Sequence, residues 1–145
     1  MKLILKIAVP ADYFFRRIIE SSLYDIEQQT GKKLNPNQLN GYTFKRKNSN
    51  GVVSRMTITA YQPNKKYAYH MHTGRNDYDV VYNIESLENE TMNLTYEETI
   101  KGSSAKVNAN NHVSGFLVGW FRKRRFKKMK RQMESDYNRQ ETSKN

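Results

Sequence analysis

The amino-acid sequence predicts an α+β fold with an antiparallel sheet of about six strands, one or two short helices after the first strand, and a long C-terminal helix. Two features carry this prediction. Between residues 42 and 101, runs rich in β-branched and aromatic residues alternate with short turn sequences, which is typical of a β-meander. Before and after this region, apolar residues recur at three- and four-residue steps, as on the faces of amphipathic helices.

The first strand and the first helix are distinguished by a change of period at Pro10. Apolar residues alternate before it, which indicates a strand with one buried face. From Ala11 the period lengthens and predicts a helix over 11–30, which ends at Gly31 because glycine readily adopts the left-handed conformation of helix C-termini. Asn35 and Pro36 then predict a short helical turn, with the asparagine as its cap.

The region after this turn predicts five strands joined by short connections. Connections this short force neighbouring strands to pair antiparallel. The expected strands are 42–47, 52–62, 66–73, 77–87 and 91–101. Residues 102–111 are small and polar and predict a loop, followed by a terminal helix that fades after about Tyr137. We therefore expect one domain over 1–139 and a frayed polar tail over 140–145.

Composition limits the classes of protein to consider. A chain of 145 residues with 37% hydrophobic residues is long enough for one packed core. It contains no cysteine, which excludes disulfides, thiolate metal sites and cysteine nucleophiles. No apolar run is long enough to span a bilayer, and the first residues do not resemble a signal peptide. We therefore expect a soluble, cytoplasmic protein.

The net charge of +11 is concentrated near the end of the chain. Residues 1–111 hold 15 basic and 11 acidic groups, whereas residues 112–145 hold 10 and 3. Eight cations form a predicted anion-binding surface, which points to anionic lipid or nucleic acid as a partner. They are Arg122, Lys123, Arg124, Arg125, Lys127, Lys128, Lys130 and Arg131.

At helical spacing these eight cations surround the helix instead of forming one stripe. The apolar residues form two separate faces, one at Phe116, Leu117, Trp120 and Phe121 and one at Phe126, Met129, Met133 and Tyr137. The two faces are rotated by well over 90°, so one straight helix does not place both on the same sheet. We expect the first half to seal the core and the second half to project as a docking arm. The alternative is a kink between residues 119 and 122.

One face of the predicted sheet collects six of the ten tyrosines, which suits the wall of a ligand pocket because each buried hydroxyl needs a partner. An ordinary aromatic core, with the hydroxyls reaching its rim, is the alternative. The predicted pocket residues are Tyr42, Arg46, Ser54, Met56, Tyr67, Tyr69, Tyr82, Tyr96 and Glu98 on the strands, with Phe116 and Trp120 on the terminal helix.

Glu98 falls on this inward face, where an unpaired carboxylate is costly. Strand alternation places Arg46 and Ser54 on the same face of the sheet, and they are the expected partners of the Glu98 carboxylate. As a functional group, Glu98 is a ligand anchor or a general acid or base. The alternative is a bulge that turns its side chain outward.

His70 and His72 lie two residues apart on one expected strand, so both rings point to the same side, away from the tyrosine face. Some metal sites use this spacing, but the sequence offers no evident third ligand. We therefore expect no metal site. We expect no cofactor either, and no nucleophilic hydrolase signature is present.

The order of strand, helices, five-strand meander and long terminal helix resembles the helix-grip fold of the START-like (SRPBCC) superfamily, in which a curved sheet wraps round the last helix. Local stretches resemble a family of small uncharacterised bacterial START-like proteins. They are residues 23–27 (Leu-Tyr-Asp-Ile-Glu), 30–32 (Thr-Gly-Lys), 67–69 (Tyr-Ala-Tyr), 73–76 (Thr-Gly-Arg-Asn) and 95–98 (Thr-Tyr-Glu-Glu), and Phe121 where it leads into the basic run. The resemblance implies a cavity for an apolar or amphipathic ligand between the sheet and the last helix.

Three functions follow from these observations. The first is the binding of a small apolar or amphipathic ligand. The second is peripheral docking on an anionic membrane or nucleic acid through the basic helix. The third is a cyclase- or hydrolase-like enzyme, for which the sequence offers no paired catalytic groups. The sequence does not indicate an oligomeric state.

Overall fold

The computed structural model describes residues 1–102 and 105–143, with side chains for 1–102 and 123–143. The predicted α+β class is confirmed, and each meander strand begins and ends within one residue of its expected bounds. In chain order the elements are β1 (Lys2–Ile7), α1 (Ala11–Thr30), the 3-10 turn η1 (Pro36–Gln38), β2 (Thr43–Lys47), β3 (Val53–Gln62), β4 (Lys66–His72), β5 (Asn76–Ser86), β6 (Met92–Gly102) and α2 (Ala105–Ser143).

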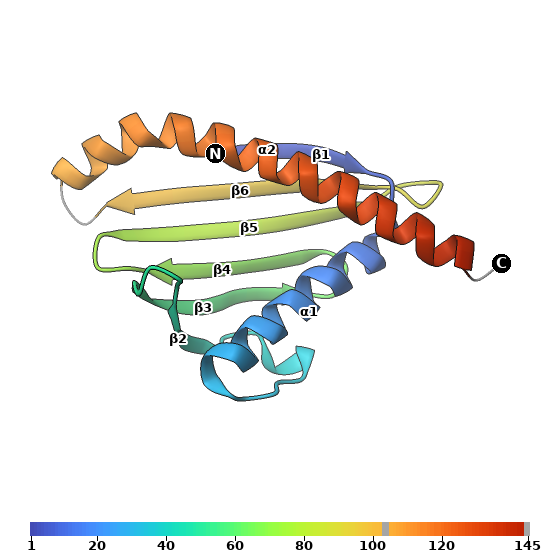
Figure 1. The fold of residues 1–145 in the computed structure, drawn as a ribbon, viewed down its shortest axis with the longest axis horizontal. Coiled ribbons are helices and arrows are strands. Elements are labelled where there is room, and N and C mark those ends of the chain that lie inside the picture. The colour runs from blue at the N-terminus through green and yellow to red at the C-terminus, as the bar shows by residue number, and fades with distance from the viewer. Residues whose placement is uncertain (103–104, 144–145) are drawn as a thin grey trace.

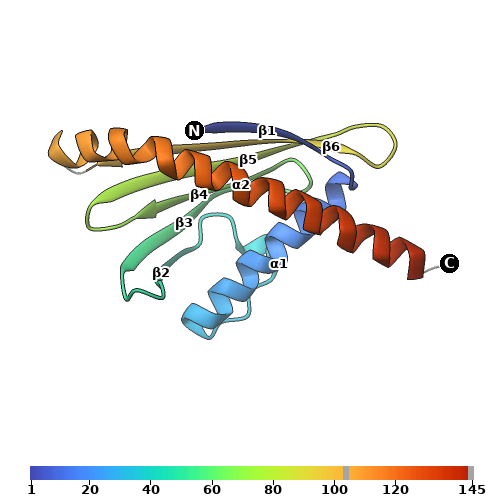
Figure 2. The same cartoon turned by 45° about the horizontal axis from the view of Figure 1, so that its top comes forward.

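The six strands form one curved antiparallel sheet in the order β1-β6-β5-β4-β3-β2 (Figures 1 and 2). Strands β2 to β6 follow one another as the expected meander. Strand β1 pairs with β6, so that Leu3 lies opposite Tyr96 and Leu5 opposite Leu94. This pairing brings the two ends of the chain's β region together at one edge of the sheet.

Helix α1 begins and ends where the sequence predicts. Its C-cap is Gly31, whose φ of 76° is in the left-handed region and whose N–H donates to the Glu27 carbonyl at 2.8 Å. The following turn η1 carries the expected asparagine cap, because the Asn35 side chain accepts from the backbone of Gln38 and the Gln38 side chain accepts from the backbone of Asn35.

Strand β3 contains a bulge that simple alternation does not reveal. Ile58 pairs with Tyr69 and Ala60 pairs with Ala68, so Thr59 is the extra residue. Beyond the bulge the side chains exchange faces. Tyr61 therefore turns toward the helices, where its ring centroid lies 5.6 Å from that of Phe15 on α1.

The bounds of α2 differ from the prediction at both ends. The loop expected over 102–111 is wrong from Ala105 onward, where the helix begins, and the helix continues beyond Tyr137 to Ser143. The frayed tail expected from residue 140 is therefore helical as far as residue 143. The polar composition of these segments indicates exposure to solvent. It does not locate the first or last residue of a helix, because the helix propensities of ordinary residues differ too little.

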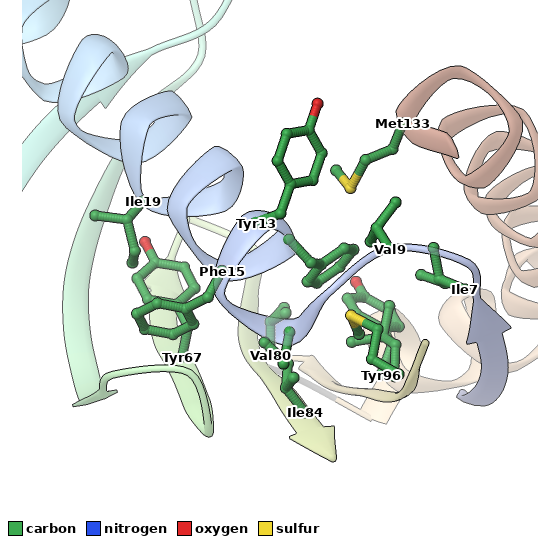
Figure 3. Close-up of a cluster of buried hydrophobic side chains, with 14 of the residues drawn as sticks. Ile7, Val9, Tyr13, Phe15, Ile19, Tyr67, Val80, Ile84, Tyr96 and Met133 are labelled. Carbon is green, nitrogen blue, oxygen red and sulfur yellow. The ribbon is translucent and has the colours of Figure 1, made fainter. Parts of the chain in front are cut away.

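Both helices lie on the same face of the sheet (Figures 1 and 2). Helix α1 packs against β2 and β5, whereas α2 packs against β6 and β1. Figure 3 shows side chains from all layers converging between them, including Phe15 and Ile19 of α1, Tyr96 of β6 and Met133 of α2. Among the described residues, no helix is long and apolar enough to cross a lipid bilayer.

Candidate functional site

A cavity of about 630 Å³ lies between α1, the central strands and α2. Its floor is the tyrosine-rich face of the sheet, and its sides are one face of α1 and two methionines of α2. The lining residues are Arg17, Ile18, Ser21, Ser22, Tyr24, Asp25, Arg46, Met56, Tyr67, Tyr69, Met71, Tyr82, Met129 and Met133.

An ion pair between α1 and β2 lies in the wall of this cavity. The Arg46 Nε donates to Asp25 Oδ2 at 2.8 Å, and the two side chains remain 37% and 31% exposed. Because both side chains are partly exposed, the pair lies where the cavity meets solvent. Arg17, a second cation of the lining, lies 3.6 Å from Asp136 and links α1 to α2.

The floor of the cavity is a set of tyrosine rings in contact. The centroid of Tyr67 lies 6.1 Å from those of Tyr69 and Tyr82, and Tyr67 itself is only 2% exposed. Its hydroxyl lies 2.6 Å from the Ser22 hydroxyl of α1. Burial raises the pKa of Tyr67 to about 12, so at neutral pH it offers a neutral phenol.

The structure brings five of the predicted pocket residues together in this lining. They are Arg46, Met56, Tyr67, Tyr69 and Tyr82. None of the predicted pocket residues comes from α1, although this helix forms one side of the cavity. Ile18, Ser22 and Asp25 follow one another at three- and four-residue steps, next to the apolar stripe that packs on the sheet, and this spacing is the signal that could have identified them.

Three other predicted residues occupy neighbouring positions. Ser54 is buried, donates to the Arg46 carbonyl at 3.3 Å and lines a second cavity of about 450 Å³. This second cavity also contains Arg75 and shares Arg46 with the first. Tyr42 stacks on Phe44 at 5.9 Å, and neither Tyr42 nor Tyr96 lines the larger cavity.

Glu98 points inward, as the strand alternation predicts, and is 5% exposed. The alternative in which a bulge turns it outward is therefore wrong. Its expected pairing with Arg46 is also wrong, since Arg46 binds Asp25. Instead, the hydroxyl of Tyr96 donates to Glu98 Oε2 at 3.1 Å. Glu98 is outside the lining of the larger cavity.

His70 and His72 face outward, as expected, and interact with carboxylates of β5. His70 Nδ1 lies 2.8 Å from Asp79 Oδ1, and His72 Nδ1 lies 2.7 Å from Asp77 Oδ1. The hydrogen bond to Asp79 raises the pKa of His70, and the hydrogen bond from His72 lowers the pKa of Asp77. Within the described residues, no group of three or more such side chains has a metal-binding arrangement.

The second half of α2 is not a free arm. Phe126 and Met133 are each 8% exposed, and Met129 and Tyr137 pack against the same core. The ring of Phe126 lies 4.4 Å from that of Tyr96. The apolar stripe that we expected to be left for a partner therefore packs against the domain's own core. The side chains of Phe116, Trp120 and Arg122 lie outside the described residues.

The fold and the cavity define the class of this protein: an α+β domain in which a curved six-stranded antiparallel sheet carries one helix after the first strand and a long helix at the C-terminus. The chain belongs to the DUF3284 family, described as a domain of unknown function, whose model matches residues 1–119. No curated protein matches it in sequence.

Solved structures share this fold at low sequence identity. Protein MLL2253 from Mesorhizobium loti is 16% identical, with a TM-score of 0.57 over 96% of this chain and 98% of that one. A conserved protein from Geobacillus kaustophilus is 13% identical, with a TM-score of 0.55 over 92% and 94%. DynU16, from the dynemicin biosynthetic locus, is 12% identical with a TM-score of 0.51, and 83% of this chain matches 42% of its length. Likeness at these identities shows the fold alone.

Proposed function

We propose that this protein is a START-like domain that binds a small amphipathic ligand in the cavity between α1, the sheet and α2. The observation that carries the proposal is the cavity itself. Its volume of about 630 Å³ falls within the range of about 300 to 1,000 Å³ found for small-molecule sites. The order of the elements and the curved sheet support the START-like assignment.

The distribution of polarity supports an amphipathic ligand. The floor consists of aromatic rings and thioethers, and methionine adapts its shape readily to an apolar guest. The partly exposed Arg46–Asp25 pair places a guanidinium at the solvent side, where it suits a planar anionic group. An apolar body with one anionic or polar head therefore fits the site best.

A fluorescent probe with the same polarity tests this proposal. We expect anilinonaphthalene sulfonate, which joins an apolar ring system to a sulfonate, to bind the wild-type protein. The variant Met71→Trp fills the cavity from β4 and should weaken binding at least about tenfold, because the lost space excludes the ring system. Native mass spectrometry after mild purification should also reveal a co-purified small molecule.

The matched control places the same bulky residue on the opposite face. Asn83 of β5 is exposed and outside the cavity lining, so Asn83→Trp should bind the probe like the wild type. Circular dichroism in the near ultraviolet should show both variants folded. Equal binding by folded Met71→Trp and wild type would place the probe elsewhere and contradict the proposal.

A cyclase- or hydrolase-like enzyme remains the alternative. Tyr96 and Glu98 are candidate acid and base groups, since their oxygens are 3.1 Å apart. Both lie outside the lining of the larger cavity, so we prefer binding to catalysis. A cytoplasmic location and the lack of a cofactor also remain predictions.

A further inference from the structure

The exposed side of α2 between residues 123 and 131 is a ridge of cations. The contacts of the helix define its orientation, because Phe126, Met129 and Met133 face the domain. At about 100° per residue, five cations fall within an arc of about 140° around the helix axis. The centre of this arc lies about 150° round the axis from the side that packs against the domain. These five exposed residues, here named the basic ridge, are Lys123, Arg124, Lys127, Lys128 and Arg131.

This orientation changes the interpretation of the basic run. From sequence alone its cations surround the helix, but the packed stripe shows which of them face solvent together. Arg125 is exposed at the flank, and Lys130 turns toward Glu134, 3.9 Å away. The ridge therefore concentrates positive charge on the side of the helix that is directed away from the sheet.

The basic ridge is short and contains no acidic residue. Lys123, Lys127 and Arg131 lie on successive turns, about 6 Å apart, so the ridge is about 12 Å long. After Met133 the sign of the charge reverses. Residues 134–143 contain Glu134, Asp136 and Glu141 against a single cation, Arg139.

These dimensions favour a phosphodiester chain over a membrane. An interfacial helix inserts an apolar face between lipid headgroups, but the apolar residues of this half of α2 pack against the domain's own core, with Phe126 and Met133 buried. A flat anionic bilayer lying along the helix would also approach the acidic segment 134–143. A phosphate backbone that crosses the helix contacts the ridge alone, and neutralising its phosphates releases counterions whatever the base sequence.

We propose that the basic ridge binds the phosphate backbone of nucleic acid independently of sequence. This activity is separate from the ligand cavity, since the ridge faces away from the sheet and none of its residues lines that cavity. Phosphate contacts of this kind make affinity fall steeply as salt rises.

The test measures the binding of labelled oligothymidine and oligouridine of about 20 nucleotides by fluorescence anisotropy across a salt series. The ridge variant carries Lys123→Gln, Lys127→Gln, Lys128→Gln and Arg131→Gln. Glutamine is a good helix former, so the helix is retained. The control variant removes four exposed lysines elsewhere, through Lys6→Gln, Lys32→Gln, Lys45→Gln and Lys65→Gln, and has the same net charge.

We expect the ridge variant to bind at least about tenfold more weakly at about 50 mM salt, with the slope of log K against log salt shallower by about 3. The control variant should keep most of the affinity and slope of the wild type. The tighter of the two oligonucleotides identifies RNA or DNA as the natural source of the phosphates.

Two outcomes overturn the proposal. Equal losses of affinity in both variants would show a response to net charge alone. Wild-type protein that binds neither oligonucleotide has no such activity, and if it then binds phosphatidylglycerol vesicles, the ridge is a membrane contact.

Discussion

The packing of the second half of α2 on the sheet can be tested by removing one side chain. Phe126 is 8% exposed, and its ring lies 4.4 Å from Tyr96 and 6.3 Å from Tyr82. In Phe126→Ala the cavity left by the ring is lined by these two aromatic residues of the core. If this half of α2 were instead a solvent-exposed arm, the same substitution would not lower the free energy of unfolding.

The expected loss follows from burial and ring contacts. Truncating a buried phenylalanine to alanine costs about 3 to 5 kcal/mol. Of this, the contact with Tyr96 contributes about 0.5 to 1.5 kcal/mol beyond area burial. Phe126 lies on a helix at the edge of the core, and alanine raises helix propensity by about 0.5 kcal/mol. We therefore expect the free energy of unfolding to fall by about 3 kcal/mol.

Urea unfolding followed by far-ultraviolet circular dichroism measures this change as a lower midpoint at an unchanged slope. The control is Lys127→Ala, on the exposed side of the same turn, which should change stability by no more than about 0.5 kcal/mol. If Phe126→Ala leaves too little folded protein, Phe126→Leu should lose about 1 kcal/mol and remain measurable. A loss from Phe126→Ala no larger than that of Lys127→Ala would refute the packing of this half-helix.

Two further predictions concern a helix cap and a surface cluster. Gly31→Ala should lose about 1 kcal/mol of stability in thermal unfolding, because its φ of 76° disfavours a side chain, whereas Gly74→Ala, with equal space and no positive φ, should be neutral. A neutral Gly31→Ala would exclude strain at the cap. The hydrogen bond to Asp79 raises the pKa of His70, so the protonated ring stabilises the folded protein. This stability is fully present below the ordinary pKa of 6.5 and is lost as the pH rises through the raised pKa. His70→Gln should therefore destabilise the protein more at about pH 5.5 than at about pH 8.5, by less than about 1 kcal/mol, and equal effects at both pH values would contradict this.

The order and bounds of the meander strands could be predicted because their determinants are local. Turn sequences such as those at 48–51 and 63–64 interrupt runs of β-branched and aromatic residues, and short connections allow only antiparallel neighbours. Alternation also placed Glu98 on the inward face correctly. Alternation does not assign the correct face to residues beyond Thr59, because the bulge there depends on pairing with β4 and leaves no signature in the sequence of β3 alone.

The candidate site was only half predictable. The strand residues of the cavity share a face by alternation, so Tyr67, Tyr69 and Tyr82 could be grouped from the sequence. The choice of partners could not be read in this way. Arg46 meets Asp25 and Tyr67 meets Ser22 because α1 crosses these strands at one particular angle, which only packing determines.

The same distinction holds for the basic C-terminal helix. The sequence by itself determined the α+β class, the strand order along the chain, and the dense positive charge between residues 122 and 131. Only the tertiary structure decided that the stripe of Phe126, Met129 and Met133 packs against the core, since an isolated helix has no preferred rotation about its axis. Burial of Phe126 and Met133 selects one rotation, and that rotation turns the basic ridge toward solvent.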